Sequence, residues 1–454
     1  MTLNLLKPRS FDLFDTLTTR WYTTPASIWE EMSVILNDEL FVEKRRKAHH
    51  ADSSSLDNIY QQFQRLYGVS NDHIEHLKRL ESQLEIERSS PIRKNINMFK
   101  DGDYIISDMY LPEPVVRSII RRVLGENTQY KLILTPNGKN AGYVWSQVSD
   151  KISQHIGDNL KSDVEQAINH GIAAQHYTEH GYDMYESTIQ NELNTQLHMI
   201  MRLCRLNNPY KPETDEYITW NMSSRVVVPL NILYAFLLKN YYDVSQYDKI
   251  LFFMRDCFFL EKIFKSLFPS LARKCFSFNT SRVMFKNTQT SWIKHATELM
   301  ANSVCVDYYA SGKSIDVFKE KNNIQNSVFI ALCKHGVESF SDQHYFFKDV
   351  NGIHRNKKKM PTNFIEIVNN TVPFGSCIDY IDGKFIRADS EHPSNCVQAV
   401  VRCIDYASNL LNRGFDTGVM SPEQDISSYI DQIDYPWLAE WRKVFQHKQN
   451  HTDN

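Results

Sequence analysis

The sequence predicts an α/β protein: a Rossmann-like parallel sheet with a helical cap inserted into it, followed by a second α/β domain. Short apolar segments of strand length alternate with amphipathic helical segments in both halves of the chain, which is typical of parallel sheets flanked by helices. A long helical segment interrupts this alternation directly after the first strand. A chain of 454 residues is also too long for one ordinary core, which favours two domains.

Five apolar segments of the first half are predicted to be strands. They are 10–14, 104–107, 131–135, 154–156 and 172–176. One helix between them begins at Pro112 and ends at Gly125. Its inward face is predicted to be aliphatic: Val115, Ile119, Ile120, Val123 and Leu124. A second predicted helix carries three apolar residues on its inward face: Val164, Ala167 and Ile168.

The segment from about 24 to 92 reads as several helices. Its apolar residues recur at helical spacing: Ile59, Phe63, Leu66, Ile74, Leu77, Leu80 and Leu84. Because it follows the first strand, such an insertion would cover the carboxyl ends of the strands, where open α/β sheets bind ligands. We therefore expect a cap.

Polar residues accumulate from 187 to 214, which predicts a linker between a first domain, 1–186, and a second domain, 215–454. The second domain begins with an apolar helix near 229–238. Predicted strands then alternate with helices: 250–254, 275–278, 304–306 and 328–332. Asp382-Gly383 between two short strands predicts a hairpin.

Composition excludes several classes of protein. A formal net charge of −3 argues against a general binder of nucleic acid or membrane surfaces. The eight cysteines form no CxxC pair, which favours reduced thiols in a cytoplasmic protein. The start of the chain does not resemble a signal peptide, and the most apolar stretch, 226–238, is too short to span a bilayer and is predicted to be a buried helix.

Chemically capable residues follow the predicted strands of the first half, in a fixed order along the chain: Asp12 with Thr16, then Ser107, then Lys139, then Asp158 with Asp163. A carboxylate can attack phosphorus and form an acyl-phosphate, which divides hydrolysis into two easier steps. Carboxylate oxygens also hold hard cations such as magnesium. Asp12 is therefore the predicted nucleophile and Asp158 with Asp163 the predicted magnesium ligands, while Ser107 and Lys139 are predicted to bind phosphoryl oxygens.

In this order, the residues resemble the four motifs of the haloacid dehalogenase superfamily. The exact motif sequences resemble one group of predicted bacterial hydrolases more closely still. They are Ser-Phe-Asp-Leu-Phe-Asp-Thr-Leu, Ser-Asp-Met-Tyr-Leu and Gly-Asp-Asn. The resemblance covers roughly 9–180 and implies a Rossmann-like core with a helical cap. It also implies that Asp12 and the backbone carbonyl of residue 14 contribute to the metal site.

One position departs from the superfamily pattern. Phosphatases of the superfamily carry an acid/base Asp two residues after the nucleophile, where this chain has Phe14. Loss of such a group costs about 10²–10⁴-fold in rate. Asp15, the next residue, is the candidate replacement, and the carbonyl of Phe14 is still expected to face the metal.

The second half has two polar turns after predicted strands, Arg255-Asp256 and Asp307 with Ser311-Gly312-Lys313-Ser314. The latter offers backbone N–H groups, hydroxyls and an ammonium to a phosphate, but it lacks the first Gly of a Walker A loop. It resembles in part the phosphoribosyl-diphosphate loop of type I phosphoribosyltransferases. A Rossmann-like domain whose turn binds nothing is the alternative.

Three functions remain open from the sequence. The first is a magnesium-dependent hydrolase of a small phosphorylated metabolite, such as a sugar phosphate or a nucleotide. The second is phosphoribosyl transfer from phosphoribosyl diphosphate in the C-terminal half, coupled to the first domain. The third is a catalytically weak sensor or scaffold, with protein contacts made by the cap and by C-terminal aromatic residues: Tyr429, Tyr435, Trp437 and Trp441.

Overall fold

The computed structural model describes residues 7–334, 343–347, 369–390 and 392–432. The chain divides into two compact units, Met1–Asp183 and Met184–Asn454. Each unit contains its own five-stranded sheet, in which every neighbouring pair of strands is parallel. The predicted α/β fold class is therefore confirmed.

The sheet of the first unit has the order β5-β4-β1-β6-β7. Its strands are β1 (Ser10–Phe11), β4 (Tyr104–Asp108), β5 (Lys131–Thr135), β6 (Gln154–Gly157) and β7 (Ala173–His176). All five lie where the sequence predicts strands, but β1 ends at Phe11 rather than at residue 14. It ends early because the chain turns after Asp12, where the backbone N–H groups of Leu17 and Thr18 both donate to the carbonyl of Leu13.

Outside the predicted cap, the helices of the first unit are α5 (Arg93–Ile96), α6 (Glu113–Leu124), α7 (Tyr143–Val148), the π-helical η1 (Leu160–Glu165) and α8 (Gln166–Asn169). Pro112 and Gly125 cap α6 as predicted. Its fully buried face includes Val116, whereas Val115 and Leu124 are only partly buried. The predicted helix near 164–168 consists of η1 and α8, and Ile168 is exposed, because the π-helical turn shifts the register of the buried face.

One face of this sheet packs against α7 and α8. The packed residues form a continuous apolar cluster: Tyr104, Ile106, Val144, Trp145, Val148, Ile152, Ala167 and Ile172. On β1, the ring of Phe11 lies 5.3 Å from that of Phe99, which follows α5.

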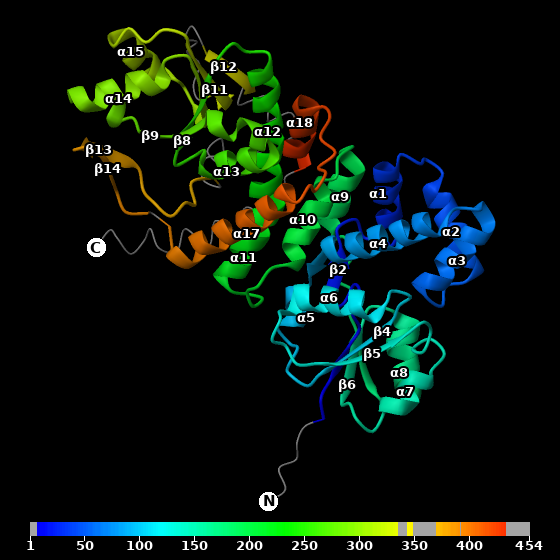
Figure 1. Ribbon diagram of the computed structural model, residues 1–454. Helices are drawn as coiled ribbons and strands as arrows, with labels where there is room; N and C mark the ends of the chain where they lie inside the picture. The colour runs from blue at the N-terminus through cyan, green and yellow to red at the C-terminus, as the bar shows by residue number, and fades with distance from the viewer. Residues whose placement is uncertain (1–6, 335–342, 348–368, 391, 433–454) are drawn as a thin grey trace, which may run out of the picture. The chain divides into compact units, whose positions relative to one another are not determined.

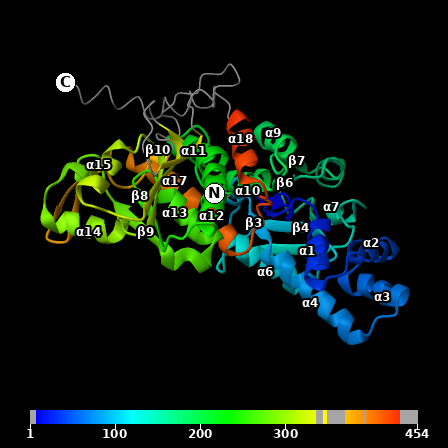
Figure 2. The same ribbon diagram turned by 90° about the horizontal axis from the view of Figure 1, so that it is seen from above.

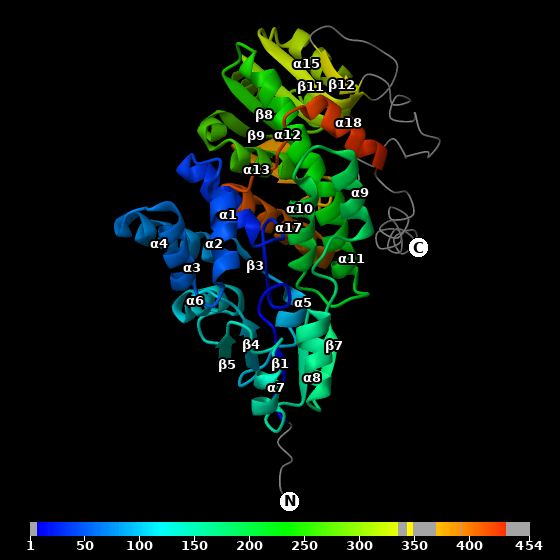
Figure 3. The same ribbon diagram turned by 90° about the vertical axis from the view of Figure 1, so that its right-hand side faces the viewer.

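The cap consists of α1 (Ala26–Leu36), α2 (Phe41–Ala51), α3 (Leu56–Tyr67) and α4 (Asn71–Glu87). These helices form a layer apart from the sheet (Figures 1 and 3). The expectation of an all-helical segment needs one correction: β3 (Ser89–Pro91) lies within it and pairs antiparallel with β2 (Thr18–Arg20). This ribbon joins the cap to the sheet, and its three-residue strands are too short for an alternating pattern to reveal them. Of the apolar residues at helical spacing, Leu66 is exposed.

Two buried ion pairs hold the cap together. Arg45 donates to both carboxylate oxygens of Glu81, at 2.9 and 2.7 Å, and Arg20 of β2 pairs in the same way with Glu85. Glu81 also accepts from the hydroxyl of Tyr110, at 3.1 Å. Since Tyr110 follows β4, this network links the cap to the core of the first unit.

The predicted linker at 187–214 is wrong. Most of it is helical, in α9 (Met184–Glu192) and α10 (Leu197–Leu206). Glu186 of α9 and Arg205 of α10 form an ion pair of 2.7 Å, and Glu186 is fully buried. Polar residues that pair with each other inside a packed helix pair lower the apparent hydrophobicity of the segment, so it resembles a linker in sequence.

The second unit contains a sheet of order β12-β11-β10-β8-β9. Its strands are β8 (Lys249–Met254), β9 (Cys275–Asn279), β10 (Ser303–Ala310), β11 (Ser327–Lys334) and β12 (Gln343–Phe347). Helices α14 (Thr290–Met300) and α15 (Lys313–Lys321) lie on one face, and α12 (Val228–Asp243) and α13 (Phe258–Leu267) on the other (Figures 1 and 2). The predicted strands are present, each extended by one to a few residues.

The remaining elements of the second unit are short turns, a hairpin and further helices. They are α11 (Asp215–Met222), η2 (Ser223–Val227), η3 (Pro269–Lys274), η4 (Met284–Lys286), β13 (Cys377–Ile381), β14 (Lys384–Arg387), α17 (Ser394–Asn412) and α18 (Pro422–Gln432). The hairpin β13–β14 turns at Asp382-Gly383 as predicted. Tyr429 is buried in α18, while Tyr435, Trp437 and Trp441 lie outside the described residues.

One continuous helix, Asp215–Asp243, is long and apolar enough to cross a membrane by length and composition alone. In the structure 83% of its apolar window is buried, as in the core helix of a soluble protein. This agrees with the predicted buried helix. All eight cysteines are buried and free.

Candidate functional site

The strand order of the first unit places two predicted site residues at a single point. When its strands are numbered by their order along the chain, the sheet has the order 3-2-1-4-5. The direction in which successive strands are added therefore reverses between β1 and β6. Asp12 directly follows β1 and Asp158 directly follows β6. The backbone N–H of Asp12 donates to the carbonyl of Ile156 at 2.9 Å, which holds the two strand ends together. Doubly wound sheets bind ligands at such a reversal.

Three carboxylates meet at this point. Asp12, Asp158 and Asp163 each offer an oxygen, and these oxygens lie within 4.8 Å of one another. Asp12 is 5% exposed, Asp163 is fully buried and Asp158 is half-buried. Burial raises the pKa of Asp12 despite the nearby Lys139, and the two neighbouring carboxylates raise it further. Burial, Asp15 and Asp163 also raise the pKa of Asp158.

Lys139 lies between two of these carboxylates. Its Nζ donates to Asp12 Oδ1 at 2.5 Å and to Asp163 Oδ1 at 2.6 Å. Burial favours the neutral amine, but Asp12 and Asp163 outweigh it and raise the pKa of Lys139, so the side chain is an ammonium. Three carboxylates and one ammonium leave an excess of negative charge, which a divalent cation would offset.

The loop that carries Lys139 is held by a residue that the sequence analysis did not single out. Asp108 accepts the backbone N–H of Lys139 at 3.0 Å and that of Asn140 at 3.2 Å. It also accepts the hydroxyl of Thr135 at 2.6 Å. The only signal for it is its place directly after Ser107, at the end of a strand. Trp145 completes the support, since its indole N–H lies 3.1 Å from the carbonyl of Lys139.

Asp163 is held by a second residue missed from the sequence, His155 of β6. Burial lowers the pKa of His155, so its ring is neutral. Because a carboxylate only accepts hydrogen bonds, Nε2 donates to Asp163 at 3.2 Å and Nδ1 accepts from the hydroxyl of Ser10 at 2.8 Å. Although burial acts in the opposite direction, the hydrogen bond from His155 and the charge of Lys139 hold the pKa of Asp163 well below its usual range.

Gly157 is required by close packing. A Cβ at this position would lie 2.4 to 2.6 Å from the carboxylate carbon, Cβ and Oδ2 of Asp163. The Gly-Asp pair after β6 therefore has two separate roles. Asp158 offers a ligand oxygen, and Gly157 leaves the space that Asp163 occupies.

The other predicted residues of the first unit lie around this cluster. Ser107 is buried at the end of β4, the neighbour of β1. The ring of Phe14 lies under the guanidinium of Arg20, 4.2 Å away. Asp15 has a left-handed backbone with φ of 56° and accepts the hydroxyl of Thr19 at 2.7 Å. Nδ1 of His180, a residue without a sequence signal, lies 4.0 Å from Asp15 Oδ1.

In the second unit, the predicted phosphate-binding residues are also brought together. All seven line one cavity of about 390 Å³: Arg255, Asp256, Asp307, Ser311, Gly312, Lys313 and Ser314. Phosphoribosyl transfer at this cavity stays a prediction.

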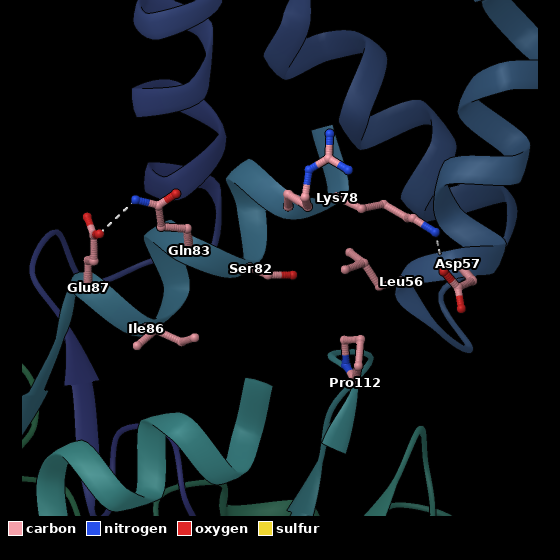
Figure 4. Close-up of a pocket in the computed structure, with 9 residues that line it drawn as sticks. Leu56, Asp57, Lys78, Ser82, Gln83, Ile86, Glu87 and Pro112 are labelled. Atoms are coloured by element: carbon pink, nitrogen blue, oxygen red, sulfur yellow. Dashed lines mark hydrogen bonds and ion pairs between the residues drawn. The ribbon is translucent and has the colours of Figure 1, made fainter. Parts of the chain in front are cut away.

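A further cavity of about 460 Å³ lies in the cap, between α3, α4 and Pro112, and contains no residue of the carboxylate cluster. Figure 4 shows that four of its polar side chains form two pairs, Lys78 with Asp57 and Gln83 with Glu87. We therefore place the candidate chemistry at the cluster.

The fold and the cluster together define a doubly wound α/β protein with a carboxylate site suited to a metal ion. Comparison with known protein families finds no matching family model, and comparison with curated proteins finds no match either.

Proposed function

We propose that the first unit is a magnesium-dependent hydrolase of phosphate esters, of the haloacid dehalogenase type. The observation that carries the proposal is the arrangement of Asp12, Asp158 and Asp163 around one point, with the Lys139 ammonium between Asp12 and Asp163. The order of these residues along the chain supports it independently, since it matches the motif order of that superfamily.

The residues present fit a hard divalent cation. Carboxylate oxygens are its preferred ligands. Burial, and after it the neighbouring carboxylates, raise the pKa values of Asp12 and Asp158, and a bound cation would favour the ionised form of both. Asp12, Asp158 and Asp163, with the backbone carbonyl of Phe14, would hold it. When bound, magnesium would neutralise charge on the phosphoryl group and so favour attack by an anion.

The chain's own residues perform the covalent steps. A carboxylate oxygen of Asp12 attacks phosphorus, and the bond from phosphorus to the ester oxygen breaks, so that the leaving alcohol takes one proton. Water then attacks the phosphorus of the acyl-phosphate and gives one proton back to the general acid, and the bond from phosphorus to the Asp12 oxygen breaks, which releases inorganic phosphate and restores Asp12. Lys139 and Ser107 hold the phosphoryl oxygens as their charge grows.

The proton for the leaving alcohol needs a donor, because Phe14 occupies the usual position of the acid. Asp15 takes this role. Its left-handed backbone and the hydrogen bond from Thr19 orient the carboxylate, and His180 lies beside it. Substrates are small phosphorylated metabolites, with sugar phosphates and nucleotides as the first compounds to test.

The test is phosphate release from a panel of sugar phosphates and nucleotides, with magnesium or with EDTA. We expect release that requires magnesium and falls by about 10³-fold or more in Asp12→Asn. Asp101→Asn, which removes an exposed carboxylate in the same unit, is the matched control and should retain activity. If no compound releases phosphate while magnesium still binds, the proposed hydrolase activity is contradicted and a sensor or scaffold is favoured.

A further inference from the structure

The cavity of the second unit lies at a reversal of strand order, as the carboxylate cluster does in the first. When its strands are numbered by their order along the chain, the sheet has the order 5-4-3-1-2. The direction in which successive strands are added therefore changes between β8 and β10. The cavity is lined by residues that follow β8, β9 and β10, among them Arg255, Thr280 and Lys313. Its volume of about 390 Å³ is in the range of small-molecule sites.

Positive charge and backbone donors converge on this cavity. Arg255, Arg282 and Lys313 line it, and Arg282 is exposed and forms no ion pair within the described part of the chain. Gly312, with φ of 74°, precedes the nine-residue helix α15. The first N–H groups of that helix therefore open at the cavity, where they and the helix dipole favour an anion.

A buried hydroxyl supplies an independent observation. Thr280 lines the cavity and is 6% exposed, yet its Oγ1 has no hydrogen-bond partner among the residues that the structure describes. Buried polar atoms almost always have a partner. A ligand oxygen in the cavity would supply one.

The Arg255 side chain is positioned in advance. Its φ of 118° is rare for any residue other than glycine, and such strained backbones cluster at functional sites. Its Nη1 donates to the hydroxyl of Ser376 at 3.1 Å, and its Nε lies 3.3 Å from Asp256 Oδ1. These contacts orient the guanidinium at the lining of the cavity, which Gly312 also lines.

The lining also limits the chemistry of the ligand. Asp256 and Asp307 also line the cavity, and carboxylates repel a second anionic group but accept hydrogen bonds from hydroxyls. We propose that the second unit binds a small polyol phosphate, with the phosphate at Arg282, Lys313 and the start of α15 and the hydroxyls toward the carboxylates. This site is independent of the hydrolase proposed for the first unit.

Calorimetric titration of the full chain in EDTA tests the proposal. Without a cation the carboxylate cluster of the first unit is negative and does not attract phosphate, so binding reports the second unit. The probes are glucose 6-phosphate, inorganic phosphate and glucose. We expect glucose 6-phosphate to bind most tightly and glucose not to bind.

Variants then locate the site. Arg282→Gln and Lys313→Gln should each weaken binding about tenfold or more, whereas Lys321→Gln, exposed at the far end of α15, should not. Thr280→Val should weaken binding without lowering the melting temperature, because its hydroxyl has no partner to lose in the described part of the chain. Absence of binding, equal binding of glucose and its phosphate, or unchanged affinity in all three variants would overturn the proposal.

Discussion

Lys139 joins two functions in one side chain. Its ammonium offsets part of the negative charge of Asp12 and Asp163, and in the proposed hydrolase it would also bind a phosphoryl oxygen. Asp108 holds its backbone and Trp145 covers its loop, so the side chain is oriented before any ligand binds. Such preorganisation favours electrostatic stabilisation of a transition state, because the charged side chain needs no reorganisation during a reaction.

Asp15→Asn tests the replacement acid. We expect the turnover number on alkyl phosphates to fall about 10²-fold or more, since a general acid contributes at least this much. An aryl phosphate has a better leaving group that needs less protonation, so its hydrolysis should fall much less. Steady-state kinetics on both substrates make the comparison. Equal losses on the two, or full activity on both, would rule out Asp15 as the acid.

Gly157→Ala tests the space reserved for Asp163. The added Cβ would meet the Asp163 side chain at 2.4 to 2.6 Å, so the carboxylate must move away from Lys139 and His155. We expect a loss of about 1–3 kcal/mol in the free energy of unfolding, together with loss of magnesium-dependent activity. Denaturation and phosphate release measure the two effects. Gly181→Ala is the control, because no atom lies within 4 Å of its added Cβ; equal behaviour of the two variants would refute the argument.

Among the elements, the cap depends on buried charge rather than on apolar packing alone. Helices α2 and α4 are joined by Arg45 and Glu81, both fully buried. The guanidinium also lies 4.7 Å from the ring of Trp29 and 5.3 Å from that of Tyr60. Breaking such a pair leaves one charge buried without its counterion, which is far costlier than losing an exposed pair.

Glu81→Gln should therefore lower the free energy of unfolding by about 3 kcal/mol or more at pH 7. Although burial acts in the opposite direction, Arg45 holds the pKa of Glu81 below its ordinary value of 4.5. A carboxylate with a lowered pKa in the folded state stabilises the fold fully above its ordinary pKa, and this stabilisation is lost as pH falls through the folded value. Urea denaturation should thus show a constant difference between wild type and variant from pH 7 to 5, and a smaller one below about 4.5.

Glu75→Gln is the matched control on the same helix, because its pair with Lys78 is exposed. It should change stability by less than about 1 kcal/mol at any of these pH values. A difference for Glu81→Gln that grows on acidification would contradict the sign of the argument.

For the whole molecule, each unit has the parts of an independent doubly wound domain. Each has a parallel sheet and helices that pack against it. At the reversal of strand order, the first unit has the carboxylate cluster and the second unit has a cavity. The two strand orders differ, which argues against a simple duplication of one domain.

A fragment of residues 7–183 should therefore fold alone. We expect cooperative thermal unfolding by circular dichroism and a melting temperature that rises with magnesium, because a ligand of the native state alone stabilises it by mass action. The same fragment with Asp158→Asn should fold but lose most of the magnesium effect. A fragment without cooperative unfolding would show that the unit depends on the rest of the chain.

The sequence by itself determined the α/β class, the strands of the first sheet, four of the five strands of the second sheet and the residues after their ends. Local hydrophobic periodicity reports which residues are buried, and parallel strands bring their carboxyl ends to one edge, so Asp12, Lys139, Asp158 and Asp163 could be expected to meet. Its errors, such as the linker at 187–214 and the inward face at Ile168, fall where paired polar residues or a π-helical turn disturb that periodicity.

Only the tertiary structure decided the partners of these residues. His155, which contacts Asp163, and Asp108, which holds the backbone of Lys139, have no local signal, because these contacts form only when separate elements pack together. The sequence likewise does not show that the buried hydroxyl of Thr280 has no hydrogen-bond partner within the described residues. Which distant residues meet depends on strand order and register. Those follow from the packing of the whole unit rather than from any segment of it.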